Sequence, residues 1–538
     1  MFQSNKGAKT IVPIFRAALR SPILWQTDSH NSFMIASLEL SGQPLKLEQI
    51  AQVAAGSLEP VLSGGARDRI ESSRQVVEKL LRDEKVAYGI NTGFGKLADV
   101  HIPACELDQL QVNLVRSHAS GLGNPLSEAE TRALMLLRAN VLATGRSGCR
   151  PLLVETLFRM LAKGISPRVP EKGSVGASGD LAPLAHLALA MLGEGECFYK
   201  HHWVPSCEAL RDGGIAPVRL AAKEGLALLN GTQCMVAVGG LALLRAERVT
   251  KLADLSGAMA LEALRGTPVA FDARIHNARP HAGQRASAAH LRELLEDSEI
   301  RNSHLHDDPR VQDAYCLRCM PQVHGAVRAA LSHARETVEV ESGSATDNPL
   351  VFADTDEILS GGNFHGAPLA MVYDYAAIAL ADLMSITERR IDRLINPDLN
   401  DGLPPFLSAR PGVSSGYMIA HVCAASLLSE ARVLAHPASV DSVPTSGGKE
   451  DHVSMGMTSA LKLRQVVENA ECVLGIELMT AAEGIDYRRP LRSSALIEAA
   501  YEATRAIVPR LTSDRSLSKD IEALAAAIRQ GTFDRFMD

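Results

Sequence analysis

The chain has few aromatic residues and no excess of positive charge. Only 4% of its 538 residues are aromatic, two of them are tryptophan, and the formal net charge is −7. A low aromatic content together with abundant alanine and leucine favours helices over sheets. A chain with a net negative charge and no basic stretch is not expected to bind nucleic acid.

The chain also lacks a disulfide framework, a paired metal motif and a long apolar run. Its nine cysteines are scattered and odd in number, which is typical of a reducing cytoplasm. Cys316 and Cys319 form a lone CxxC without the second ligand pair that zinc needs, so we expect structural thiols and no metal site. The longest apolar run, residues 234–244, is shorter than a membrane span, and no membrane association is expected.

The composition predicts a soluble globular protein with more than one structural unit, at 46% hydrophobic and 22% charged residues. Residues 1–35 lack clear periodicity, and we expect an extension that is disordered or not native, with the functional start near Met34. Residues 36–215 contain short segments and many turns, which predicts a smaller N-terminal domain. Residues 216–538 predict a helical bundle and a C-terminal helical region.

The sequence predicts helices over most of the chain. Residues 127–145 begin with a capping box, Ser127 and Glu130, and end at Gly145. Residues 151–164 begin with proline and end with glycine, as helices often do. Three long segments are apolar on most faces, which predicts burial in a bundle core or between subunits: residues 231–266, 365–395 and 450–484.

The stretch GSVGASGDLAPLAH, residues 173–186, places the smallest side chains at Ala177, Ser178 and Gly179. Attack of the Gly179 nitrogen on the Ala177 carbonyl would close a five-membered ring, because glycine permits the close approach. Loss of water, including the Ser178 hydroxyl, would leave an electrophilic methylene group. Asp180 is expected to cap the following helix. From these residues alone, a glycine-rich turn before a capped helix is the simpler interpretation.

Further motifs connect this stretch with a known family. YGINTGFG (88–95), LLNGTQ (228–233), QDAYCLRC (312–319), DNPL (347–350), GNFHG (362–366) and EDHVSMG (450–456) follow in order along the chain. With GSVGASGDLAPLAH, they resemble the aromatic amino acid lyases over about residues 36–530. The resemblance implies a prosthetic 4-methylidene-imidazole-5-one group, MIO, formed autocatalytically from Ala177, Ser178 and Gly179, with no diffusible cofactor and no metal.

The resemblance also implies an architecture and an assembly. We expect a mainly α-helical fold similar to that of fumarases and aspartases, with a long-helix bundle and a smaller N-terminal domain that carries the MIO loop. We further expect a homotetramer whose active sites combine loops from three subunits. The long apolar segments agree with burial between subunits, although they do not give the number of subunits.

The resemblance assigns roles to residues whose local pattern also has a simpler interpretation. It implies that Tyr88 is the base that removes the β-proton, which requires a lowered tyrosine pKa. It implies that Asn230 lies beside MIO, although an Asn-Gly pair alone predicts a turn. Tyr315 is expected near the electrophile and Arg318 on the substrate carboxylate, both on one helical face. Two further residues are expected to line the site, although Phe364 could equally serve packing: Gln312 and Phe364.

Substrate preference depends on Ser117, His118 and Glu450. Ser-His at 117–118 resembles the family members that act on histidine, and His118 could bond to an imidazole ring. A carboxylate such as Glu450 can accept the imidazole N–H or stabilise its charged form. The expected reaction is elimination of ammonia from L-histidine to give trans-urocanate, the first step of histidine degradation.

Some positions depart from the family pattern, and two other functions stay open. Lys449, Met320, His324 and Cys316 replace residues that are common in relatives, which leaves the exact substrate preference open. The first alternative is a tyrosine or phenylalanine ammonia-lyase, or an aminomutase. The second is an inert helical assembly protein whose loop never cyclises. Rates, regulation and the atom of the substrate that MIO bonds do not follow from the sequence.

Overall fold

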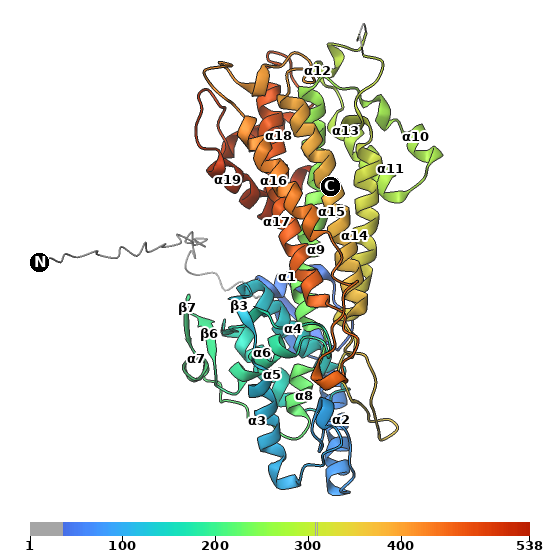
Figure 1. Ribbon diagram of the computed structural model, residues 1–538, viewed down its shortest axis with the longest axis vertical. Helices are drawn as coiled ribbons and strands as arrows, with labels where there is room; N and C mark the ends of the chain where they lie inside the picture. The colour runs from blue at the N-terminus through green and yellow to red at the C-terminus, as the bar shows by residue number, and fades with distance from the viewer. Residues whose placement is uncertain (1–35, 307, 309, 538) are drawn as a thin grey trace, which may run out of the picture. The chain divides into compact units, whose positions relative to one another are not determined.

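Four long helices form the centre of the described structure. The structure, a computed structural model, describes residues 36–537 apart from 307 and 309. The long helices have 23 to 31 residues and pack side by side (Figure 1). They are α9 (Gln233–Ala263), α14 (Met320–Ser342), α15 (Ala367–Ile395) and α17 (Gly456–Asp486). The predicted mainly α-helical fold with a long-helix bundle is therefore confirmed.

Shorter helices precede and flank this bundle. Those before α9 are α1 (Leu47–Ala54), α2 (Gly64–Arg82), α3 (Leu107–His118), α4 (Glu128–Ala143), α5 (Pro151–Ala162), α6 (Leu181–Met191), α7 (Ser206–Asp212) and α8 (Glu224–Leu229). Those after it are α10 (Ala273–Ala278), α11 (Ala282–Leu294), α12 (Glu299–Asn302), α13 (Tyr315–Arg318), α16 (Met418–Leu434), α18 (Ala495–Ile507) and α19 (Ser518–Arg529). The expected domain boundary near residue 215 stays a prediction, and the expected extension 1–35 lies outside the described residues.

The strands are short and form small separate sheets. β1 (Ala36–Leu40) pairs in parallel with β2 (Leu58–Leu62), so that Ala36 lies opposite Leu58. The other pairings are antiparallel: β3 (Leu122–Pro125) with β5 (Pro170–Lys172), β6 (Glu196–Tyr199) with β4 (Ser166–Pro167) and β7 (His202–Pro205), and β8 (Leu350–Phe352) with β9 (Glu357–Leu359). These pairs tie the loops around the helices and form no central layer.

The sequence signals for the starts of α4 and α5 are confirmed, whereas the predicted start of α17 is not. In α4 the Ser127 hydroxyl accepts the Glu130 amide at 3.2 Å, and the Glu130 carboxylate accepts the Ser127 amide at 2.8 Å. α5 begins at Pro151. The predicted start of α17 at residue 450 is wrong, because Met455 has a left-handed backbone with φ of 56° and the helix begins after it.

Among the described residues, one helix, α15, has the length and the apolar composition to cross a membrane. However, 61% of its most apolar window is buried inside the structure, where α15 packs on α14, α16 and α17. Core helices of soluble proteins have the same composition. Its place in the bundle therefore accounts for its hydropathy.

Two departures from the family pattern, Met320 and His324, lie at the start of α14 inside the bundle. The Met320 sulfur lies so close to Gly257 of α9 that a Cβ there would be 2.4 Å from it. His324 is fully buried, and its Nδ1 lies 2.7 Å from the Asp254 carboxylate. Burial lowers the pKa of His324. These residues therefore fill and bridge the helix contacts of the core.

Adjacent glycines in α9 provide a matched test of the packing. A Cβ on Gly239 would lie 2.1 Å from the Tyr373 ring of α15, whereas one on Gly240 would meet only side-chain ends at 3.2 Å and beyond. We expect Gly239→Ala to destabilise the protein by about 1–3 kcal/mol through overpacking. Gly240→Ala should be nearly neutral, because a gain in helix propensity of about 1 kcal/mol offsets the tighter contact. Urea unfolding measures both, and equal stabilities would contradict this account of the α9–α15 contact.

Candidate active site

Six of the predicted site residues line one cavity of about 570 Å³, here called the Tyr88 cavity. They are Tyr88, His118, Ser178, Asn230, Phe364 and Glu450. They come from six separate loops or helix ends: the ends of α3 and α8, the loop after α2 and the loops before α6, α15 and α17. The fold therefore gathers residues that are up to several hundred positions apart in the chain.

The Ala177–Gly179 loop is held by a glycine pair. Gly179 has a positive φ of 74°, and a Cβ on it would lie 2.1 Å from the Gly231 carbonyl oxygen. The next amide, of Asp180, donates to that oxygen at 2.7 Å. Only glycine fits at position 179, and Ser178 consequently faces the cavity.

Asp180 does not cap α6, which corrects the sequence expectation. It occupies the N-cap position of α6, but its side chain accepts no hydrogen bond from that helix. Its carboxylate instead accepts the Met235 amide in the first turn of α9 at 2.8 Å and the Ser174 hydroxyl at 3.2 Å. Burial raises the pKa of Asp180 to about 7, although these hydrogen bonds oppose the rise. Asp180 therefore caps α9 and ties it to the loop.

Asn230 follows the last turn of α8 as its C-cap residue, and its expected place beside MIO stays a prediction. Its Nδ2 donates to the Asn348 carbonyl at 3.1 Å and lies 3.4 Å from the Asp347 carboxylate. Asp347 is fully buried and forms a 2.7 Å ion pair with Lys223, which is also fully buried. The Asn230 Oδ1 atom is buried and, among the described residues, has no hydrogen-bond partner. It can accept a bond from a ligand in the cavity.

Glu450 reaches the loop from the segment before α17. Its Oε1 accepts the Ser178 hydroxyl at 3.1 Å, and its Oε2 accepts the Thr445 hydroxyl at 2.5 Å. The carboxylate thus lies against the central residue of the Ala-Ser-Gly sequence. Glu450 lies outside α17, so the carboxylate is not a first-turn residue of that helix.

The environment of Tyr88 within this chain does not lower its pKa. Burial and the charge of Glu450 raise the pKa of Tyr88, and a backbone hydrogen bond with Gly95 only partly opposes them. Two lysines, Lys96 and Lys449, line the same cavity. The charge that stabilises a Tyr88 phenolate must therefore come from outside the immediate contacts of the ring.

His118, the last residue of α3, presents one ring nitrogen for a ligand. Its Nδ1 lies 2.9 Å from the Leu114 carbonyl, which can only accept, so Nδ1 carries the proton. Burial lowers the pKa of His118, which keeps the ring neutral near pH 7. Nε2 is then a free acceptor. Ser117 does not line the cavity, but its hydroxyl lies 3.0 Å from His118 Nδ1 and supports the ring orientation.

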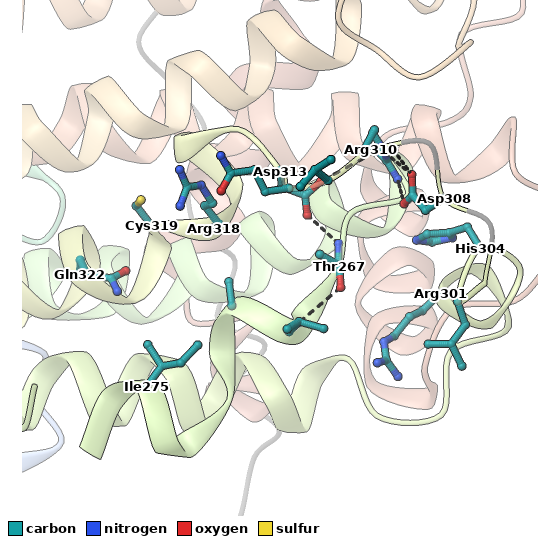
Figure 2. Close-up of a pocket in the computed structure, with 15 residues that line it drawn as sticks. Thr267, Ile275, Arg301, His304, Asp308, Arg310, Asp313, Arg318, Cys319 and Gln322 are labelled. Atoms are coloured by element: carbon teal, nitrogen blue, oxygen red, sulfur yellow. Dashed lines mark hydrogen bonds and ion pairs between the residues drawn. The ribbon is translucent and has the colours of Figure 1, made fainter. Parts of the chain in front are cut away.

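Three other predicted residues lie elsewhere in the chain. Gln312 and Arg318 line a second cavity of about 480 Å³, the Arg318 cavity, which Arg310 and Asp313 also line (Figure 2). The Tyr315 ring stacks under the Arg318 guanidinium at 4.5 Å, as their predicted common helical face requires. Tyr315 is 71% exposed, and the Arg318 Nε is buried without a hydrogen-bond partner among the described residues.

The two cavities lie at opposite ends of α9. Asn230 precedes the start of α9, whereas Arg310, in the Arg318 cavity, donates to the Leu264 carbonyl at its far end, at 3.0 Å. A helix of 31 residues spans about 46 Å at 1.5 Å per residue. α13 and α8 accordingly lie far apart in Figure 1. One chain alone cannot bring Arg318 to Tyr88.

Sequence reasoning missed the support under Asn230. Asp347 and Asn348 belong to the DNPL motif, which was noted only for its resemblance. The buried pair with Lys223 had no sequence signal, because Lys223 lies in an ordinary segment and takes a left-handed backbone with φ of 75°. The motif itself was the signal that could have found half of this arrangement.

The loop and its surroundings fit the formation of MIO. The residues are Ala-Ser-Gly, the glycine position admits no side chain, and the serine faces a cavity with a carboxylate on its hydroxyl. The free Asn230 Oδ1 offers an acceptor beside the loop. A self-made electrophile with adjacent proton-transfer groups defines the chemistry of a carbon–nitrogen lyase.

Comparisons with known proteins agree with this chemistry. The family described as aromatic amino acid lyase matches residues 45–506. The chain therefore belongs to the aromatic amino acid lyase family and is a carbon–nitrogen lyase.

Individual members of this family are similar to the chain over nearly its whole length. Histidine ammonia-lyase of Stigmatella aurantiaca is 54% identical over 92% of this chain and 96% of its own length. The structure is similar to histidine ammonia-lyase from Trypanosoma cruzi, with a TM-score of 0.86 and 41% identity over 93% of this chain and 95% of that one. It is also similar to tyrosine aminomutase from Streptomyces globisporus, with a TM-score of 0.88 and 38% identity over 93% and 98% of the two chains.

The buried ion pair under Asn230 can be tested directly. Lys223→Met would leave the Asp347 carboxylate buried and unpaired, so we expect a loss of about 3–5 kcal/mol in unfolding free energy. The double variant Lys223→Met/Asp347→Leu should recover most of it. Lys200→Met removes an exposed pair with Asp212 and should cost less than about 1 kcal/mol. Urea unfolding of the wild type and the three variants measures these free energies. A Lys223→Met variant as stable as the wild type would contradict the interpretation.

Proposed function

We propose that the protein acts as a histidine ammonia-lyase, which eliminates ammonia from L-histidine to give trans-urocanate. The observation that carries the proposal is the Tyr88 cavity, in which Ser178, Glu450 and a neutral His118 face one space. The high identity to histidine ammonia-lyases supports the choice of substrate. The reaction would be the first step of histidine degradation, in the cytoplasm.

The residues of the cavity divide the chemistry between them. MIO, formed from Ala177, Ser178 and Gly179, supplies an electrophile that makes the substrate amine a better leaving group. Tyr88, as the phenolate, takes the proton from the β-carbon. Asn230 Oδ1 accepts a hydrogen bond from the amine, and Phe364 packs against the substrate.

His118 and Glu450 select the imidazole ring. The free Nε2 of His118 accepts the N–H of a substrate imidazole, and a phenyl ring offers no such donor. When the substrate imidazole is protonated, Glu450 accepts its second N–H and stabilises its charge. Both groups would remain unpaired beside phenylalanine, which makes the discrimination stronger than shape alone.

The site is completed by other subunits in a homotetramer. Arg318 would bind the substrate carboxylate, and Tyr315 and Gln312 would line the amine side. In one chain, however, the Arg318 cavity lies at the far end of α9 from Asn230, and this helix of 31 residues spans about 46 Å. Apolar side chains remain exposed on α15 and α16, among them Met371 at 63% and Ile419 at 65%. Their burial between subunits would bring the Arg318 end of one chain to the Tyr88 cavity of another.

A substrate panel tests the reaction. Purified protein is given L-histidine, L-tyrosine and L-phenylalanine separately, and the conjugated acid is followed by ultraviolet absorbance with ammonia as a check. We expect product from histidine. His118→Phe should lower kcat/KM for histidine about 5- to 150-fold, since a bond of about 1–3 kcal/mol is lost. Product from tyrosine or phenylalanine alone would overturn the pocket assignment, and a β-amino acid product would indicate an aminomutase.

Mixing two inactive variants tests the shared site. Tyr88→Phe should lower kcat by about 10²–10⁴-fold, because the proton acceptor is lost. Arg318→Met should also be nearly inactive, because the carboxylate loses its bidentate partner. If the two residues come from different subunits, co-expression restores about one quarter of the sites by random assembly. Activity no higher than that of the separate variants would contradict the shared site.

A further inference from the structure

The hydrogen bond between Ser178 and Glu450 concerns the formation of the prosthetic group, which precedes substrate binding. Residue 178 is encoded as a serine, and its hydroxyl donates to Glu450 Oε1 at 3.1 Å. In the finished prosthetic group this hydroxyl no longer exists. The contact therefore belongs to the precursor of the enzyme, and Glu450 is poised beside the oxygen atom that must leave.

Formation of the group releases two waters. In the first step the Gly179 nitrogen bonds to the Ala177 carbonyl carbon, and the carbonyl oxygen leaves as water with the protons of the Gly179 and Ser178 amides. A carbon–nitrogen double bond remains between Ala177 and Ser178. In the second step the Ser178 Cα–H and Cβ–Oγ bonds break, the electron pair of the C–H bond forms the Cα–Cβ double bond, and Oγ leaves with the second water.

The second step needs a proton acceptor and a proton donor at Ser178. Hydroxide is a poor leaving group, so Oγ must be protonated as it departs, and the Cα proton must be removed. A carboxylate at hydrogen-bond distance from Oγ can do both in turn. It takes up the Cα proton and returns it to Oγ, so that one water leaves and the carboxylate ends as it began.

The other acidic groups near the loop are engaged elsewhere. The Asp180 carboxylate accepts the Met235 amide and the Ser174 hydroxyl and has no bond to Ser178 among the described residues. Tyr88 is bonded to the backbone of Gly95 and, among the described residues, has no hydrogen bond to Ser178. Glu450 is anchored through its second oxygen by Thr445, which leaves Oε1 directed at Ser178.

We propose that Glu450 is the proton-transfer residue for the dehydration of Ser178 when MIO forms. The inference rests on the proposed function, since it assumes that MIO is made. It gives Glu450 a task in maturation that is separate from any contact with the imidazole ring.

The mass of the Ala177–Gly179 peptide provides the test. The wild-type peptide should be lighter than its sequence by two waters, about 36 Da by stoichiometry. Glu450→Gln keeps the size and the bond to Oγ but cannot shuttle a proton, so its peptide should retain the second water, about 18 Da, for at least ten times longer after synthesis. Ser178→Ala provides the mass standard for a loop that has no second water to lose. Asp451→Asn, at an exposed carboxylate on the same loop that does not line the Tyr88 cavity, should mature like the wild type.

A rescue experiment separates proton transfer from folding. Glu450→Ala should stall in the same way, and added formate should restore loss of the second water, because it replaces the missing carboxylate. Circular dichroism and gel filtration check that each variant is folded. Full loss of two waters in Glu450→Gln at the wild-type rate would overturn the inference and leave the proposed function intact. An unmodified mass in active wild-type protein would instead overturn the proposed function itself.

Discussion

The close approach of Gly179 to Gly231 is the contact on which the site depends. It brings two backbones within a distance that no side chain allows and joins the reactive loop to the start of α9. Buried hydrogen bonds hold the Gly231 side of this contact. Arg138 donates to the Asn230 carbonyl and to the Gln233 side chain, both at 2.7 Å. Asp180 adds the bond to α9 on the other side. The loop is therefore positioned by fully buried groups, and its own side chains remain free for chemistry.

The bundle supplies the rigidity that this arrangement needs. The first turns of α9 are buried on every side, which explains why its sequence lacks an amphipathic pattern there. The Tyr373 hydroxyl on α15 donates to the Met235 carbonyl at 3.0 Å, in the same turn that binds Asp180. The reactive loop is thus anchored to one end of helices that run to the Arg318 cavity at the other end. The separation that prevents a complete site in one chain is a direct result of this anchoring.

Much of the fold could be predicted from the sequence, because its signals are local. Ser127 and Glu130 make the capping box that their spacing predicts, and the long apolar segments form the bundle. The role of Asp180 could not be predicted, because its partner Met235 lies 55 positions away. The start of α17 was missed for a similar reason, since the amide of the left-handed Met455 donates to the distant Val175 carbonyl. Sequence motifs and the Ser-His pair predicted six of the residues that line the Tyr88 cavity, but neither Lys223 nor the distance to Arg318.

In the proposed scheme, Glu450 serves both the formation of MIO and the binding of the substrate. A carboxylate beside a bound imidazole must face the space that the substrate occupies, and that space adjoins the reactive loop. Before cyclisation the Ser178 hydroxyl projects into the same space and satisfies the carboxylate. Loss of the hydroxyl removes that partner, so the Oε1 atom becomes free for a ligand only when the electrophile is complete. Maturation and substrate binding are then coupled through one hydrogen-bond acceptor, because the precursor occupies the group that the finished site must offer.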